Sequence, residues 1–145
     1  MSQEFRGFSP IDPVPADLYD LRRLQDELGR FSSAVLLRLG SRVAVPRWNS
    51  SWDGRGGRDY FFDNFEFHVR GRPDPLFLGF FHYRRPDHLV GSSFQVWERE
   101  IDDRPIMMIP LSKIIADVNV ANQQGQLSRY LDDLAGELRR ELGLN

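Results

Sequence analysis

The middle of the chain, residues 41–109, is a succession of short strand-like segments separated by residues that form tight turns. The strongest turn signals are residues 71–75 (GRPDP) and 102–105 (DDRP). Short turns join strands of opposite direction, because a parallel crossover needs roughly a dozen residues or more. The pattern therefore predicts a meander of four to five antiparallel strands.

Apolar residues predict strands at 43–45, 60–70, 76–83, 94–101 and 106–109. The polar, glycine-rich stretch 48–58 (WNSSWDGRGGR) predicts a loop, and residues 91–93 (GSS) predict a hairpin turn. We expect Arg70 to pair with Leu76 across the turn that joins the strands at 60–70 and 76–83. This register determines which residues of the hairpin share a face. In that register the core face holds Phe65, Phe67, Val69, Phe77, Phe81 and Tyr83.

Helical spacing flanks the strands on both sides. Apolar residues at steps of three and four from Leu18 to Leu39 predict an amphipathic helix, and Leu111–Val118 and Leu127–Leu138 predict two more. The predicted fold class is α+β, with an N-terminal amphipathic helix, the antiparallel meander and two C-terminal helices. We expect an extended or disordered lead-in at 1–15 and a single domain at 16–145.

Composition excludes several classes of protein. The 145 residues include no cysteine, which excludes thiol catalysis, zinc ribbons and disulfide scaffolds. No apolar run approaches the ~20 residues of a membrane span, and the N-terminus lacks signal-peptide features, so we expect a cytoplasmic protein. A formal net charge of −2 argues against a dedicated nucleic-acid binder, although it leaves a local basic patch open.

Signatures of catalysis are missing from the sequence. It contains no nucleophile elbow, Walker loop or dinucleotide-binding fingerprint. The register above separates His68 and His82 by roughly 13 Å, which is too far for a shared metal ion. We therefore expect no cofactor and no metal site, and no catalytic residue can be assigned.

The leading hypothesis is a non-enzymatic protein-binding module, that is, a small adaptor, chaperone or regulatory protein that engages a partner protein through its aromatic-rich sheet. In the assumed register Leu76, Leu78 and Phe80 fall on the face opposite the core, which leaves either an exposed apolar strip or a second helix layer. A homodimer is part of this hypothesis. The candidate binding residues are Trp48, Trp52, Arg55, Arg58, His68, Arg70, Phe80, His82 and Arg84.

Two alternatives belong to other classes of function. Arg55, Arg58, Arg70, Arg84 and Arg85 suggest a binder of an anionic ligand, either a phosphate-containing small molecule or nucleic acid. Asp53, Glu66 and His68 suggest a small metal-assisted hydrolase or nuclease, which requires the three side chains to lie close together.

Overall fold

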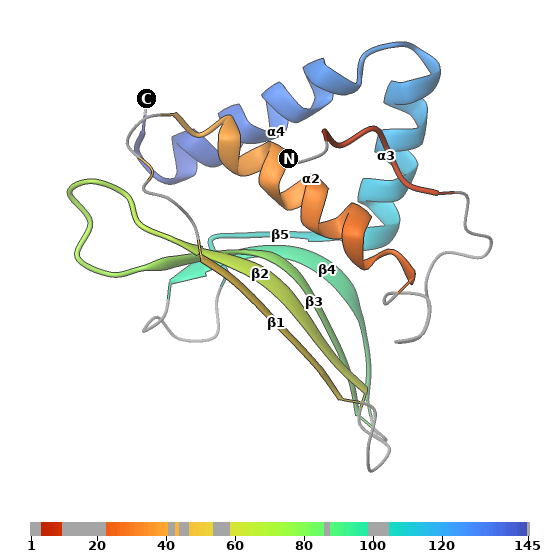
Figure 1. Ribbon diagram of the computed structural model, residues 1–145, viewed down its shortest axis with the longest axis horizontal. Helices are drawn as coiled ribbons and strands as arrows, with labels where there is room; N and C mark the ends of the chain where they lie inside the picture. Colours follow the sequence, from red (N-terminus) through yellow and green to blue (C-terminus); the bar gives the residue numbers. More distant parts are fainter. Residues whose placement is uncertain are drawn as a thin grey trace.

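Three helices cover one side of a five-stranded antiparallel sheet in the computed structural model (Figure 1). The structure describes residues 4–9, 23–40, 43, 47–53, 59–85, 88–98 and 105–144. Each strand pairs with the next one in the sequence, in the order β1-β2-β3-β4-β5. The predicted α+β class and the antiparallel meander are therefore confirmed. Among the described helices, none has the length and apolar character needed to cross a bilayer.

The sheet is built from five strands whose bounds match the sequence prediction only in part. They are β1 (Arg47–Asp53), β2 (Asp59–Phe67), β3 (Leu76–Arg85), β4 (His88–Glu98) and β5 (Met107–Pro110). The expectation of a loop at 48–58 is wrong for its first half, which is β1. The sequence of β1 mixes strand-favouring tryptophans with asparagine and aspartate, which are depleted in strands, and its pairing with β2 decides the conformation.

The predicted hairpin turn at 91–93 is also wrong, because these residues lie inside β4. The ladder between β3 and β4 shifts register there, between Phe81 and Tyr83 on one strand and between Ser93 and Val90 on the other. An extra residue in one strand of a pair produces such a bulge. Glycine and serine therefore mark an irregularity within a strand rather than the end of one.

The central hairpin uses a register different from the expected one. Phe67, and not Arg70, is the partner of Leu76, so the connection is eight residues long. Two prolines, Pro73 and Pro75, lack the N–H groups that would extend the ladder, and Val69 pairs instead with Val43. This shift by an odd number of positions exchanges the two faces of β3 relative to β2.

The exchange of faces corrects the predicted core. Leu76, Leu78 and Phe80 lie buried under the helices, whereas Phe77 and Phe81 lie on the other face. The predicted core positions Phe65, Phe67 and Val69 do contribute to the core or pack against it. Tyr83 shares the parity of Phe77 along β3.

The helices follow the apolar spacing of the sequence. They are α2 (Gln25–Leu37), α3 (Leu111–Gln123) and α4 (Leu127–Glu141). In α2 the buried residues include Leu28, Phe31 and Val35, whereas Leu37 is exposed. Residues 18–22, where the first predicted helix begins, lie outside the described residues. Gly125, at a φ of 67°, lies in the middle of the short connection between α3 and α4, in a conformation that favours glycine.

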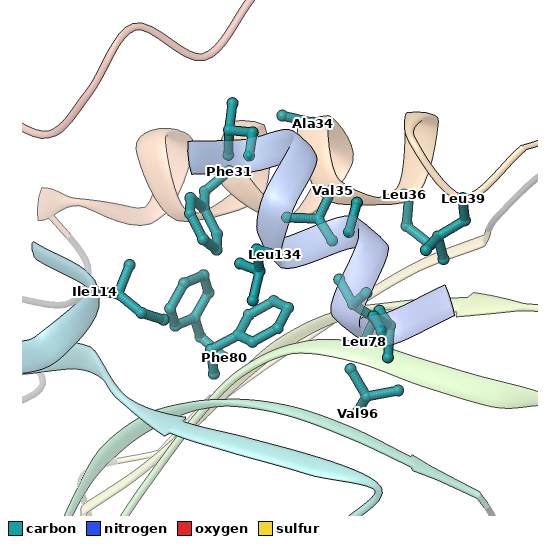
Figure 2. Close-up of a cluster of buried hydrophobic side chains, with 14 of the residues drawn as sticks. Phe31, Ala34, Val35, Leu36, Leu39, Leu78, Phe80, Val96, Ile114 and Leu134 are labelled. Carbon is teal, nitrogen blue, oxygen red and sulfur yellow. The ribbon is translucent and has the colours of Figure 1, made fainter. Parts of the chain in front are cut away.

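Phe31 of α2 stands at the centre of the core (Figure 2). Its ring centroid lies 5.7 Å from that of Phe80 on β3 and 5.5 Å from that of Phe94 on β4. Phe80 and Phe94 contact each other edge to face at 5.5 Å. Edge-to-face contacts between rings add stability beyond the burial of their area. These three rings therefore join α2 to the middle of the sheet.

An N-terminal arm, residues 4–9, packs against α2 and α3 without regular secondary structure (Figure 1). Phe5 is buried, and its ring centroid lies 5.3 Å from that of Phe31. The backbone N–H of Ser9 donates to the Glu27 carboxylate at 3.0 Å, and Asn122 Nδ2 donates to the Arg6 carbonyl oxygen at 3.0 Å. The arm thus completes the core from the helix side. The predicted boundary between residues 15 and 16 lies outside the described residues.

Candidate functional site

One predicted binding residue, Phe80, is part of the core. Its relative exposure is 1%, and it lies on the helix-covered side of the sheet. The prediction that it belongs to a binding face is wrong, because the register shift of the central hairpin turns it inward. The apolar strip inferred from Leu76, Leu78 and Phe80 is therefore not an exposed surface.

The other predicted residues fall into three groups. His68 and Arg70 are exposed, beyond the end of β2. The backbone positions of Trp48 and Trp52 lie in β1, and those of His82 and Arg84 lie in β3. The remaining two, Arg55 and Arg58, lie outside the described residues.

The two alternative sites require residues that the sheet keeps apart. Arg84 lies eight residues along β3 from the end of the hairpin that holds Arg70, which is roughly 25 Å. Asp53 pairs with Tyr60, six residues along β2 from Glu66, which is roughly 20 Å. The register partner of His82 is Phe61, seven residues from His68, so the two histidines are also distant. These separations do not fit a shared metal ion or a single arginine cluster.

The open face of the sheet, defined as the face on which no described helix packs, offers a different set of residues. Its central row runs across four strands through Asn64, Gly79, Gln95 and Met108. Phe77 pairs with Trp97 in the ladder of β3 and β4, on the same face as this row. Figure 1 shows all three helices on the opposite side.

Aromatic and sulfur-containing side chains supply the apolar part of the open face. The rings of Phe77 and Trp97 stack with centroids 5.9 Å apart and planes inclined by 20°. Both side chains are partly exposed. Met108 on β5 is 60% exposed, a high value for a large apolar side chain. These three residues form an apolar surface across β3, β4 and β5.

The polar centre of the open face consists of amide and hydroxyl groups. Gln95 Nε2 donates a hydrogen bond to Ser93 Oγ at 2.8 Å. Asn64 is fully buried, and neither its Nδ2 nor its Oδ1 has a hydrogen-bond partner among the described residues. A buried amide without a partner costs about 1–3 kcal/mol, and with no exposed area the Asn64 amide is closed to donors and acceptors of another molecule.

A pocket of about 250 Å³ lies between α3 and α4, away from the sheet. Tyr130 lines it, and burial, together with the nearby Asp117 carboxylate, raises the pKa of its hydroxyl to about 12. Asp133 and Arg129 also line the pocket, and Lys113 Nζ lies 2.9 Å from Asp117 Oδ2. Its charges therefore largely balance within the chain and select no ligand class.

Metal-ligating side chains do not gather anywhere in the described parts of the chain, where no group of three or more histidines and carboxylates could hold an ion.

Comparison of the chain with protein-family models, curated proteins and solved structures finds no match. The candidate site therefore depends on geometry alone.

Sequence reasoning missed the residues of the open face because it paired the central strands in the wrong register. The register expected from the sequence places Phe77 in the core, and no motif of the sequence marks Trp97, Gln95 or Met108 as binding residues. The alternation in β4 carries a usable signal, since Phe94 and Val96 are buried while Gln95 and Trp97 are partly exposed. This alternation indicates the buried face of β4, and the register of β3 with β4 places Leu78 and Phe80 on the same face.

Proposed function

We propose that this chain is a non-enzymatic, cytoplasmic protein-binding module, of the adaptor, chaperone or regulatory kind, that engages a partner protein through its open face. The observation that carries the proposal is the stacked and partly exposed Phe77–Trp97 pair next to the exposed Met108. Aromatic residues and methionine are enriched at protein interfaces, where they contribute much of the binding energy.

The shape of the open face favours a protein partner over a small molecule. Its apolar residues are distributed over three adjacent strands, a broad surface, whereas small-molecule sites are concave and enclose most of their ligand. A protein partner can cover such a surface with apolar side chains and place polar groups over its centre.

The chemistry at the centre of the face also favours binding over catalysis. Asn64, Gln95 and Ser93 carry amides and a hydroxyl, which donate and accept hydrogen bonds. These groups do not gain or lose protons near neutral pH, so they do not serve as general acids or bases. Of the three, Gln95 is partly exposed and suits the recognition of a polar group on a partner, whereas Asn64 and Ser93 are buried.

The test compares three exposed apolar side chains that lie on different surfaces: Met108 on the open face, Leu37 on α2 and Val120 on α3. Each is replaced by arginine in the full-length chain, and the proteins bound to each variant in an extract of the native host are identified and their affinities measured. We expect Met108→Arg to weaken the main interaction at least tenfold, with the two control variants unchanged.

Two results would contradict the proposal. One is an interaction that Leu37→Arg or Val120→Arg abolishes while Met108→Arg leaves it intact. The other is a structure of the complex in which Phe77, Trp97 and Met108 keep the exposure that they have in the free chain. Circular dichroism melts of all three variants check that each remains folded.

A further inference from the structure

The two edges of the sheet differ in how they are protected. β5 has four residues and ends at Pro110, which has no N–H to offer to another strand. β1 has seven residues, without proline or lysine, and no described strand lies beyond it. A long edge strand without such protection is a template for pairing with another strand.

The sequence of β1, RWNSSWD, is complementary to itself when it is read in the opposite direction. Antiparallel pairing of two copies about Ser50 places Arg47 of one copy opposite Asp53 of the other. The same register places Trp48 opposite Trp52. Opposite charges and aromatic residues are the cross-strand pairs that stabilise antiparallel strands.

Symmetry limits the registers available to such a pair. A two-fold axis perpendicular to the sheet keeps both helix layers on the same side, and directly opposed residues must then lie on the same face. The axis must therefore pass through a residue position. With the axis at Asn49 or Ser51, only five of the seven β1 residues find a partner in the other strand. With the axis at Ser50 all seven are paired, and both ends carry an attractive charge pair.

We propose that a second copy of this chain binds along the free edge of β1, centred on Ser50, and so joins two five-stranded sheets into one. Among the described strands β1 has a neighbour on one side only, and the opposed positions of Arg47 and Asp53 in two copies supply the charge complementarity that identifies the partner. Within its own sheet Arg47 pairs with Glu66, so in the dimer it stands between two carboxylate residues in adjacent strands.

The first experiment exchanges the charges at the two ends of β1. In full-length protein, Arg47→Asp alone or Asp53→Arg alone places like charges at both ends of the dimer. We expect the dimer of each variant to have a dissociation constant about tenfold or more above that of the wild-type dimer. An equimolar mixture of the two variants restores association. In the mixed pair the introduced aspartate faces the introduced arginine, and native Asp53 faces native Arg47.

Sedimentation equilibrium over a dilution series from nanomolar to high micromolar provides the readout. The wild-type chain and the mixture are expected to reach twice the 16.9 kDa of one chain, while each variant alone needs about tenfold or more higher concentration to reach that mass. A wild-type chain that remains monomeric throughout overturns the proposal. Single variants that dimerise like the wild type also overturn it, as does a mixture that remains monomeric.

A cysteine placed on the two-fold axis tests the register directly, because the chain has no cysteine of its own. Two Ser50→Cys residues would face each other within the ~4.4–6.8 Å between Cα atoms that a disulfide requires. We expect rapid cross-linking of Ser50→Cys under mild oxidation and much slower cross-linking of the neighbouring Asn49→Cys. Equal rates would overturn the register.

Arg47 and Asp53 stand at β1 positions on the same face as Asn64, but β2 separates β1 from the strands that hold Phe77, Trp97 and Met108. The Met108→Arg variant is expected to dimerise like the wild type, and the β1 charge variants alter no residue of the Phe77–Trp97–Met108 surface. Failure of the dimer therefore leaves the proposed function standing, and failure of the proposed function leaves the dimer standing.

Discussion

Gly79 of β3 pairs with Asn64 of β2 and leaves no room for a side chain. A Cβ built on it would overlap the carbonyl oxygen of Asp63 and the Cα of Asn64. Both of these are backbone atoms of the neighbouring strand, so they cannot move aside as a flexible side chain could. A glycine inside a strand commonly marks such a close approach.

We therefore expect Gly79→Ala to lower the free energy of unfolding by about 2–3 kcal/mol, as overpacking in a well-packed interior does. Gly136→Ala is the matched control, since a Cβ at this position in α4 meets open space. In a helix interior alanine is favoured over glycine by about 0.5–1 kcal/mol, so the control should gain stability. Urea unfolding of both variants measures the difference, and equal effects would contradict the close approach.

At the scale of elements, the N-terminal arm behaves as part of the core although it has no regular secondary structure. Phe5 and Phe8 lie with ring centroids 5.1 Å apart, and both rings contact Phe31 at 5.3 and 6.0 Å. Phe31 in turn contacts the sheet. Removal of the Phe5 ring would therefore weaken the packing of α2 as well as that of the arm.

Phe5→Ala is expected to reduce the free energy of unfolding by about 3 kcal/mol, at the lower end of the range for buried phenylalanine because an arm can partly collapse into the space. Arg6→Ala is the control. Its side chain is exposed and its carbonyl group still accepts from Asn122, so the change should stay within about 0.5 kcal/mol. Denaturant titration measures the free energy of unfolding of both variants. An unchanged value for Phe5→Ala would mean that the arm adds nothing to the stability of the core.

At the scale of the whole molecule, the distribution of charge does not form a continuous basic surface in the described residues. The net charge is −2, and Arg70 and Arg84 stand toward opposite ends of the β2–β3 hairpin. Arg72 is engaged with Glu98, and Arg38 Nε donates to Asp132 at 2.8 Å. These two described arginines therefore bind carboxylates of the chain itself, which leaves them less available to phosphates.

We accordingly expect the full-length chain to pass through a heparin column without retention at about 100 mM salt. A protein that makes several phosphate contacts is held at low salt and released steeply between ~50 and 200 mM salt. Retention with that steep salt dependence would contradict the expectation and would favour the anion-binding alternative. A chain with a known phosphate-binding surface serves as the positive control for the column.

The sequence by itself was sufficient for the class of fold and the order of its elements. Apolar residues at helical spacing predicted α3 and α4 in the right places, and turn residues predicted the antiparallel order of the strands. These features depend on local spacing, which a single chain displays directly. The strand β1 escaped detection because its asparagine and aspartate are depleted in strands, and its pairing with β2 decides the conformation.

Only the tertiary structure decided which side of the central strands faces the helices. The side-chain period of a strand is two, so an odd shift in the pairing of β2 with β3 moves every residue of β3 to the other face. The turn residues allowed both Arg70 and Phe67 as the partner of Leu76, and packing against Phe31 favours the register that buries Phe80. That choice removed Phe80 from the candidate site and brought Phe77, Trp97 and Met108 together on the open face.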